Sequence, residues 1–278
     1  MQIQVQGADL YAYTGGKALD ANQPTAIFIH GVLCDHSVWA LQSRYLANHG
    51  WNVLAIDLPG HCKSAGAAPR TVEEAAETIA QLLDAAGLQQ AALIGHSWGS
   101  LIAMEAAAGL GARISHLVLV GTADPMKVAP ALLEQALSAT DQAIAMVQTF
   151  SRATLAPPSG AGSWVFGAGM ALARRVQASN GDTNLLHTGF VACDSYRNGQ
   201  AAMAALACPV LFVLGEQDQM TPARAARSLV DAARAAGKQV QVQMVPSGHN
   251  QMTESPDATL FAIHHFLQAQ AAAPQLPA

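Results

Sequence analysis

Short apolar runs alternate with longer stretches of helical period along most of the chain, and no other feature of the sequence constrains the fold as strongly. The first half contains four apolar runs, at residues 25–30, 51–57, 91–95 and 116–121. Two clear helical stretches lie between them, at residues 37–49 and 71–86. Nearly continuous apolar runs are typical of strands buried on both faces, as in a parallel sheet that helices cover. This alternation predicts an α/β fold.

The alternation stops after residue 121 and resumes near residue 209, with strands predicted at 209–215 and 240–245 and helices at 221–236 and 256–270. About 80 residues separate the two parts of the pattern, and they have helical period at 130–150 and 167–178 with a loop at 157–162. An insertion of this length is more typical of a helical cap than of a free loop. We therefore predict a core of residues 1–123 and 207–278 and a cap of residues 124–206.

Local signals mark several element ends. Residues 2–13 alternate apolar and polar side chains about a central glycine, which predicts a hairpin of two edge strands. Thr71 with Glu74 three positions later is a capping box, and Gly87 is a plausible helix stop. Thr221 before Pro222 predicts an N-cap followed by a first-turn proline.

The motif Gly95-His96-Ser97-Trp98-Gly99 lies between a predicted strand and the helical stretch 100–110. A strand-to-helix turn this tight holds its central residue in a strained conformation and needs small residues two positions to either side. Ser97 would then stand at a helix N-terminus, where free N–H groups can stabilise an oxyanion. Taken alone, Gly-x-Ser-x-Gly also arises by chance in a glycine-rich chain, so the context decides its meaning.

Other candidate residues follow strands that end at the same edge of the predicted sheet. Asp218 follows the strand 209–215 and His249 follows the strand 240–245, which gives the chain order Ser, Asp, His. His30-Gly31 ends the first central strand, so the Val32 and Trp98 N–H groups are predicted to form an oxyanion hole. Asp124 is an alternative acid, but it is better explained as a residue at the entrance of the cap.

These residues resemble the α/β-hydrolase fold superfamily over nearly the whole chain. The matching segments are His30-Gly31 with Trp39, residues 57–61, the turn at Ser97, residues 215–218 and Gly248-His249. The resemblance implies a mostly parallel eight-stranded sheet with helices on both faces, an antiparallel second strand and an inserted helical cap. It also implies that Ser97, His249 and Asp218 form a catalytic triad that uses no cofactor and no metal. One departure is Cys62, where relatives typically have glycine.

The resulting hypothesis is a serine hydrolase that cleaves an ester, or a related acyl bond, of a small to medium apolar substrate through an acyl-enzyme. The same triad also serves carbon–carbon bond hydrolases, perhydrolases and acyltransferases, so these activities stay open. A non-catalytic ligand-binding relative is the alternative from another class, because a fold does not fix a function. The intact set of Ser97, Asp218 and His249 favours an enzyme.

Residues of the substrate pocket are harder to predict. His36, Phe150 and His187 are the candidates, although lone polar residues on loops are more often hydrogen-bonded to the protein or to water. The cap region also supplies apolar side chains that suit a hydrophobic pocket, although helix packing alone explains most of them. These are Met126, Met146, Trp164, Phe166, Met170, Phe190 and Met203.

Composition excludes several other classes of protein. The 278 residues are 51% hydrophobic and 12% charged with a net charge of −5, and no basic cluster exceeds Arg174-Arg175, which argues against a nucleic-acid binder. The four cysteines are scattered, the start does not resemble a signal peptide, and no apolar run is long enough for a membrane span. We therefore expect a cytoplasmic protein, monomeric or homodimeric, whose partner is a small-molecule substrate and not a nucleic acid or a membrane.

Overall fold

A mixed sheet forms the centre of the molecule. The structure, a computed structural model, describes residues 1–153, 165–181 and 183–271. In spatial order the strands of this eight-stranded sheet are β1 (Gln2–Val5), β2 (Ala8–Tyr13), β4 (Asn52–Ile56), β3 (Thr25–Ile29), β5 (Ala91–His96), β6 (Ile114–Val120), β7 (Val210–Gly215) and β8 (Val240–Val245). Strand β2 pairs antiparallel with β1 and with β4, and the remaining pairs are parallel. The predicted α/β architecture with an antiparallel second strand is confirmed.

Helices cover both faces of the sheet, and successive strand residues point to opposite faces. In β3, Ile27 and Ile29 pack with one set of helices and Ala26 and Phe28 with the other. The first set is α2 (Val72–Ala85), α3 (Trp98–Leu110), α8 (Gly199–Ala205) and α9 (Arg227–Ala235). The second set is η1 (His36–Trp39), α1 (Ala40–Ala47), α10 (Gln251–Glu254) and α11 (Pro256–Ala271), and short turns η2 (Gly111–Arg113) and η3 (Ala223–Ala226) join neighbouring elements.

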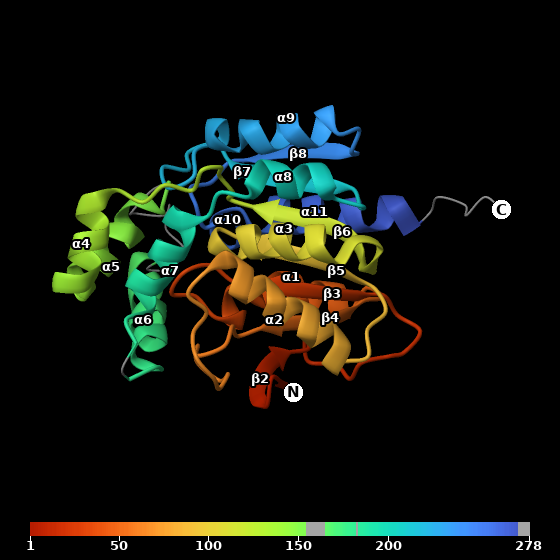
Figure 1. The fold of residues 1–278 in the computed structure, drawn as a ribbon, viewed down its shortest axis with the longest axis horizontal. Coiled ribbons are helices and arrows are strands. Elements are labelled where there is room, and N and C mark those ends of the chain that lie inside the picture. Colours follow the sequence, from red (N-terminus) through yellow and green to blue (C-terminus); the bar gives the residue numbers. More distant parts are fainter. Residues whose placement is uncertain (154–164, 182, 272–278) are drawn as a thin grey trace.

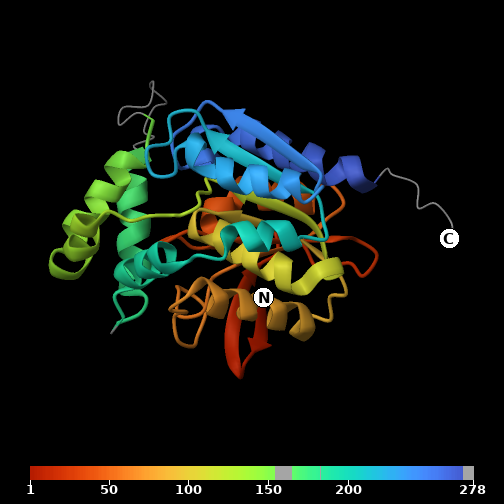
Figure 2. The same cartoon turned by 45° about the horizontal axis from the view of Figure 1, so that its top comes forward.

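Four helices gather at one end of the sheet, as both ribbon views show (Figures 1 and 2). They are α4 (Pro130–Ser138), α5 (Thr140–Phe150), α6 (Val165–Ala178) and α7 (Leu185–Ser195). Most of their buried side chains form a cluster of their own, which Leu33 joins from the loop after β3, whereas Ala192 and Cys193 of α7 pack into the core cluster that includes α3. Helix α8 packs instead on α3 and α9. The cap boundaries 124–206 stay a prediction, and α4 to α7 are the part of that range that stands apart from the sheet.

The predicted helical character of residues 130–150 is confirmed, but it is divided between two helices, because the chain breaks at Ala139 between α4 and α5. Ala139 has φ −151° and ψ 59°, outside the helical region. Asn184, at the start of α7, donates a side-chain hydrogen bond to the Ala136 carbonyl at 2.7 Å, and the Thr140 hydroxyl donates to the same carbonyl at 2.8 Å. These contacts satisfy the hydrogen-bonding capacity of a carbonyl at the end of α4. The break therefore needs no glycine or proline, and the sequence contains no signal that marks it.

The predicted ends of α2 are confirmed. The amide of Glu74 donates to the Thr71 hydroxyl at 3.1 Å, and the Glu74 carboxylate accepts from the Arg70 amide at 2.7 Å. Gly87 follows the helix with φ +67°, a conformation that glycine adopts readily. None of the helices within the described ranges combines the length and the apolar character that crossing a membrane requires.

Candidate active site

Ser97 lies at a strained turn between β5 and α3. Its φ of +53° and ψ of −120° are rare for a residue with a side chain. A Cβ atom at Gly95 would overlap the Gly99 carbonyl, and a Cβ atom at Gly99 would overlap the carbonyls of Ile29 and His30. The amide of Ser97 donates to the Val120 carbonyl at 2.9 Å and ties the turn to β6. The glycine spacing in the sequence therefore reflects a close backbone approach at both positions.

The loop after β3 passes directly beside Ser97. A Cβ atom at Gly31 would lie 3.2 Å from the Ser97 Cβ atom, so this close approach favours glycine, although less strictly than at Gly95 and Gly99. Buried His30 holds the loop, because its Nδ1 donates to the Gly31 carbonyl at 2.8 Å and its Nε2 accepts from the Leu58 amide at 3.0 Å. Within the part of the chain that the structure describes, the Val32 and Trp98 amides have no protein acceptor. Both N–H groups are thus free to bind an external oxygen.

Asp218 and His249 form a buried pair at the ends of β7 and β8. His249 Nδ1 donates to Asp218 Oδ2 at 2.8 Å. The other carboxylate oxygen, Oδ1, accepts from the Met220 and Thr221 amides, both at 2.8 Å. Burial alone would raise the pKa of Asp218, but the charge of His249 and hydrogen bonds from His249 and Thr221 outweigh it and hold the pKa below its usual value. An ionised Asp218 keeps the proton of His249 on Nδ1, which leaves Nε2 able to accept a proton.

Thr221 contacts both residues of this pair, although the sequence predicted that it would be the N-cap of a helix. Its hydroxyl donates to Asp218 Oδ2 at 2.8 Å and lies 3.1 Å from His249 Nδ1. The following turn is η3, for which Pro222 and not Thr221 is the cap residue. Gln251 adds a longer bond from Nε2 to Asp218 Oδ2 at 3.4 Å. The N-cap prediction for Thr221 is therefore wrong, and the Asp-x-x-Thr spacing was the available signal for its contact with Asp218.

Two further contacts fix the backbone of His249. The buried ring of His96 donates from Nε2 to the His249 carbonyl at 2.8 Å, with the two ring centres 4.8 Å apart. From the other side, the His249 amide donates to the Ser151 carbonyl at the end of α5, also at 2.8 Å. The position of the His249 backbone therefore depends on β5, through His96, and on α5, through Ser151. The sequence analysis predicted neither contact.

A small cavity opens at Ser97, with a volume of about 50 Å³. Ser97, Val32 and His249 line it together with apolar side chains from α5 to α7, among them Ile144, Val147, Leu186 and Phe190. A second cavity of about 900 Å³ shares Leu33, Cys34, Gln148 and Asn250 with the first. The larger cavity therefore lies next to the small one at the serine, with part of one wall in common.

The structure places none of the three predicted pocket residues in the wall of the cavity at Ser97. The His36 ring bonds to Asp57 and packs against Tyr11, and the Phe150 side chain is 47% exposed. His187 lies on α7 next to Leu186, which lines the cavity, but His187 itself is not part of the cavity wall. Of the apolar residues named from the sequence, Phe190 lines the cavity, Met126 and Met203 pack in the core, and Trp164 lies outside the described residues.

Asp124, the alternative acid, bonds elsewhere. Its carboxylate accepts from Gln200 Nε2 at 3.2 Å and from Ser228 Oγ at 3.3 Å. These partners lie on α8 and α9, so Asp124 links helices of the core face. The acid that pairs with His249 in the structure is Asp218.

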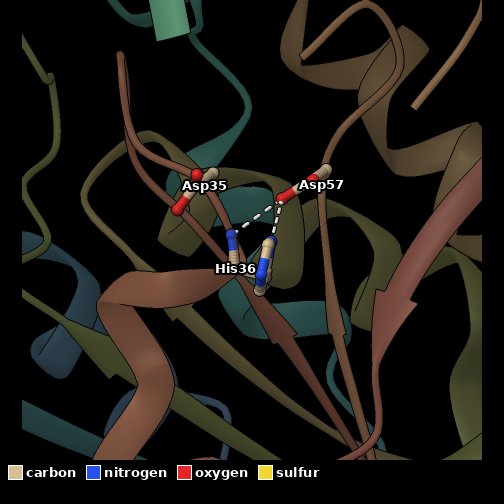
Figure 3. A group of neighbouring side chains, drawn as sticks. All are labelled: Asp35, His36 and Asp57. Atoms are coloured by element: carbon tan, nitrogen blue, oxygen red, sulfur yellow. Dashed lines mark hydrogen bonds and ion pairs between the residues drawn. The ribbon is translucent and has the colours of Figure 1, made fainter. Parts of the chain in front are cut away.

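Asp35, His36 and Asp57 form a cluster that could be considered for a metal ion (Figure 3). Asp57 Oδ1 accepts from the amide and from Nδ1 of His36, at 2.8 and 2.7 Å. Asp35 is bound by Ser37 and, at 2.6 Å, by Arg175, and these bonds outweigh burial and lower the pKa of Asp35 to about 2. A cation would have to displace these donors, so the cluster is better explained as a network that joins the loops after β3 and β4.

Cys62 shows why glycine is typical at its position. Its φ is +46°, in the left-handed region that favours glycine, and its amide donates to the Ser179 hydroxyl at 2.9 Å. The thiol lies 3.5 Å from Asp35 Oδ2. The substitution therefore changes the side chain and leaves the backbone conformation expected for glycine.

We predict that acid destabilises the fold through buried histidines. Burial lowers the pKa of His61 and of His96 to about 3. Because the unfolded chain has an ordinary histidine pKa of ~6.5, it binds more protons than the folded protein between these values, and stability falls as the pH decreases. The contribution of each histidine to the slope grows as the pH falls below ~6.5 and approaches about 1.4 kcal/mol per pH unit near about pH 5. Urea unfolding from about pH 7 to about pH 5 should reveal this loss, before most aspartates titrate.

The variant His61→Gln provides the control. Near about pH 5 it should reduce the slope of the unfolding free energy against pH by about 1.4 kcal/mol per unit, and by less near about pH 7, whatever it does to the absolute stability. An unfolding free energy that stays constant over this pH range would contradict the assignment of these two histidines as neutral groups in the folded protein.

Comparisons with known proteins agree with this geometry. The sequence profile described as alpha/beta hydrolase fold matches residues 24–256. A dihydrolipoyllysine-residue acetyltransferase component of the acetoin cleaving system from Cupriavidus necator is 34% identical over 111 residues, 40% of this chain and 28% of that protein. Lipase LipV from Mycobacterium tuberculosis is 35% identical over 95 residues, 34% of this chain and 36% of that protein. The matched regions thus span about a third or less of these relatives.

A solved structure is similar to this protein over a much larger part of the chain than these relatives are. The esterase from Exiguobacterium antarcticum superposes with a TM-score of 0.80, covering 96% of this chain and 98% of that one at 18% sequence identity. At this level of identity the similarity shows only that the two proteins share a fold. Both the superposition and the match to the family profile extend over most of the chain.

Proposed function

Because the chain belongs to the α/β-hydrolase fold family, we propose that it is a serine hydrolase that cleaves an ester bond through an acyl-enzyme. The observation that carries the proposal is the pairing of His249 with ionised Asp218 at a cavity that Ser97 also lines. A serine is a weak nucleophile until a base removes its proton, and an oriented neutral imidazole is the usual base. The strained turn supports the same role, because it exposes the serine at the cavity.

The first half of the proposed reaction forms the acyl-enzyme. His249 Nε2 takes the proton of the Ser97 hydroxyl while the serine oxygen attacks the carbonyl carbon, and the carbonyl oxygen becomes an oxyanion. The free Val32 and Trp98 amides stabilise that oxyanion, and each donor of this kind is worth about 3–4 kcal/mol. The tetrahedral intermediate then collapses, and the alcohol leaves with the proton that His249 returns.

Water completes the reaction. His249 accepts a proton from water as the water oxygen attacks the acyl carbonyl, and then returns that proton to Ser97 as the acid leaves. Asp218 keeps its charge throughout and stabilises the imidazolium that forms in each half. Every step uses groups that the chain itself provides.

The cavity dimensions support a small group at the reacting carbonyl. About 50 Å³ beside Ser97 accommodates only a few atoms, and its apolar lining favours a short hydrocarbon chain over a polar one. Longer parts of a substrate would extend into the neighbouring cavity of about 900 Å³. A short acyl ester is thus the substrate class that we propose, ahead of the carbon–carbon, peracid and acyl-transfer reactions that the same residues would support.

A panel of esters tests the proposal. We expect p-nitrophenyl acetate and butyrate to be hydrolysed with a higher kcat/KM than the octanoate, because a long apolar acyl chain exceeds the small cavity beside Ser97 and would have to reach the larger one. Release of p-nitrophenol is measured in the presence and absence of competing alcohols, which separates hydrolysis from acyl transfer. A folded protein that turns over none of these esters, or any thioester, lactone or vinylogous diketone, would instead support a ligand-binding role.

A further inference from the structure

Arg152 is a buried cation beside the larger cavity. It follows α5, with 7% of its surface exposed, and it contributes to the lining of the cavity of about 900 Å³. Its neighbour Ser151 lines the small cavity and bonds to the His249 amide. The guanidinium is therefore one residue away from the segment that holds the histidine in place.

No described residue pairs this charge with a carboxylate in direct contact. Nη1 donates to the Thr253 hydroxyl at 3.2 Å and Nη2 to the Gln148 side-chain oxygen at 3.3 Å, and both acceptors are neutral. Within residues 1–153, 165–181 and 183–271, the buried Nε has no hydrogen-bond partner. Among the described residues, no carboxylate oxygen lies within 4.0 Å of Arg152.

The neighbouring charges offset the charge of Arg152 only in part. The carboxylate of Glu254 favours the charged form of Arg152 from a distance, but it accepts its hydrogen bonds from the Ala153, Gly248 and Asn250 amides and not from the guanidinium. Arg175, the other arginine of the cavity wall, is paired with Asp35. Burial lowers the pKa of Arg152, which agrees with a cation that its surroundings solvate poorly.

A buried, incompletely bonded guanidinium is costly unless an anion meets it. The cavity wall around it offers apolar contacts from Leu33, Leu172 and Met252, and the cavity shares part of its wall with the small cavity at Ser97. A carboxylate fits this environment, because its two oxygens match the planar fork of an arginine. The ligand that completes the site would thus belong to the same molecule as the ester.

We propose that Arg152 is a substrate-binding residue that takes a carboxylate group, so that the preferred substrates are esters with a carboxylate remote from the scissile bond. This inference rests on the proposed ester hydrolysis and narrows its substrate class. The carboxylate can belong to the acyl part, as in a monoester of a dicarboxylic acid, or to the alcohol part, as in an acylated hydroxy acid. A structural role for Arg152 as a clamp between α5 and Thr253 is the competing explanation.

Matched pairs of esters test the proposal. Monomethyl succinate, glutarate and adipate are compared with methyl pentanoate for the acyl part, and 4-acetoxybutanoate is compared with butyl acetate for the alcohol part. We expect one arm to prefer the carboxylated ester by roughly 10- to 100-fold in kcat/KM, the range for hydrogen bonds to a charged group. The arm that shows the preference identifies which part of the substrate bears the carboxylate.

Substitutions then separate binding from structure. Arg152→Met should abolish the preference, and Arg152→Lys should keep a smaller one, because an ammonium is a point charge without the fork. Arg174→Met is the matched control, since Arg174 is exposed and paired with Asp141, and it should retain the full preference. A clamp role would lower kcat/KM of charged and neutral esters alike, so an unchanged ratio in Arg152→Met overturns the proposal. If that variant does not fold, the ratio in Arg152→Lys decides.

A binding experiment keeps this inference separate from the proposed activity. Calorimetric titration of monomethyl glutarate and 4-acetoxybutanoate into Ser97→Ala, and into Ser97→Ala combined with Arg152→Met, requires no turnover. We expect the second substitution to weaken binding of one ligand by roughly 10-fold or more. Equal binding by both proteins would refute the role of Arg152, whereas absent hydrolysis with Arg152-dependent binding would refute only the hydrolase. Neutral esters hydrolysed without any carboxylate preference would refute only the role of Arg152.

Discussion

Ser97→Ala is expected to reduce kcat for short esters by ~10⁶-fold, the loss seen when the nucleophile of a serine triad is removed. Alanine has no oxygen to attack the carbonyl, and neither His249 nor the free Val32 and Trp98 amides can replace that bond-forming step. Binding should largely survive, because the cavity walls stay in place. Release of p-nitrophenol by the unchanged protein and by the variant, at matched concentration, measures the loss.

A fluorophosphonate probe gives the same prediction a second readout. Only an activated hydroxyl reacts rapidly with such phosphorus, so intact mass should increase by one probe per chain and peptide mapping should locate it at Ser97. Ser100, which follows in the same turn and donates to the Ser97 carbonyl, is the internal control and should stay unlabelled. Labelling at another serine, or undiminished turnover by Ser97→Ala, would show that the nucleophile lies elsewhere.

The parts of the fold that the sequence predicted correctly depend on local chemistry. The strands are apolar runs because helices cover them on both faces, and β3 illustrates the rule with side chains buried in both core clusters. The turn at Ser97 was predictable because Gly95 and Gly99 are required by backbone contacts that any side chain would obstruct. In both cases the constraint acts on residues that are close together in the sequence.

The errors arise where distant residues decide the structure. The break at Ala139 depends on Asn184, which caps the end of α4 from the start of α7. Pocket residues depend on which face of a cap helix turns toward Ser97, and composition does not specify that face. Arg152 is an ordinary arginine in the sequence, and only its burial and its lack of a directly paired carboxylate among the described residues distinguish it. The proximity of Ser97, Asp218 and His249 was easier to predict, because parallel strands bring their carboxyl ends to one edge.

The second prediction concerns which carboxylate, that of Asp218 or that of Asp124, orients His249. Asp218→Asn should preserve the fold and lower kcat by about 10⁴-fold, the effect of this change in a serine triad. The Met220 and Thr221 amides would hold the asparagine oxygen where Oδ1 lies now, which places its NH₂ group against His249 Nδ1. Because two donors cannot share that contact, the imidazole would move its proton to Nε2 and lose the lone pair that accepts the Ser97 proton.

Asp124→Asn is the matched control, since it makes the same chemical change at the other candidate acid. Its partners, Gln200 and Ser228, lie on α8 and α9, so we expect kcat close to that of the unchanged protein. Both variants are assayed on one short ester, with unfolding curves to show that each is folded. A large loss of kcat in Asp124→Asn with a small loss in Asp218→Asn would contradict the assignment. The charge that orients His249 during the reaction would then come from Asp124, and the Asp218–His249 pair of the structure would not be the catalytic one. The 2.8 Å bond from His249 Nδ1 to Asp218 Oδ2 favours the opposite result, because an imidazolium forming in each half of the reaction is stabilised most by the carboxylate that touches it.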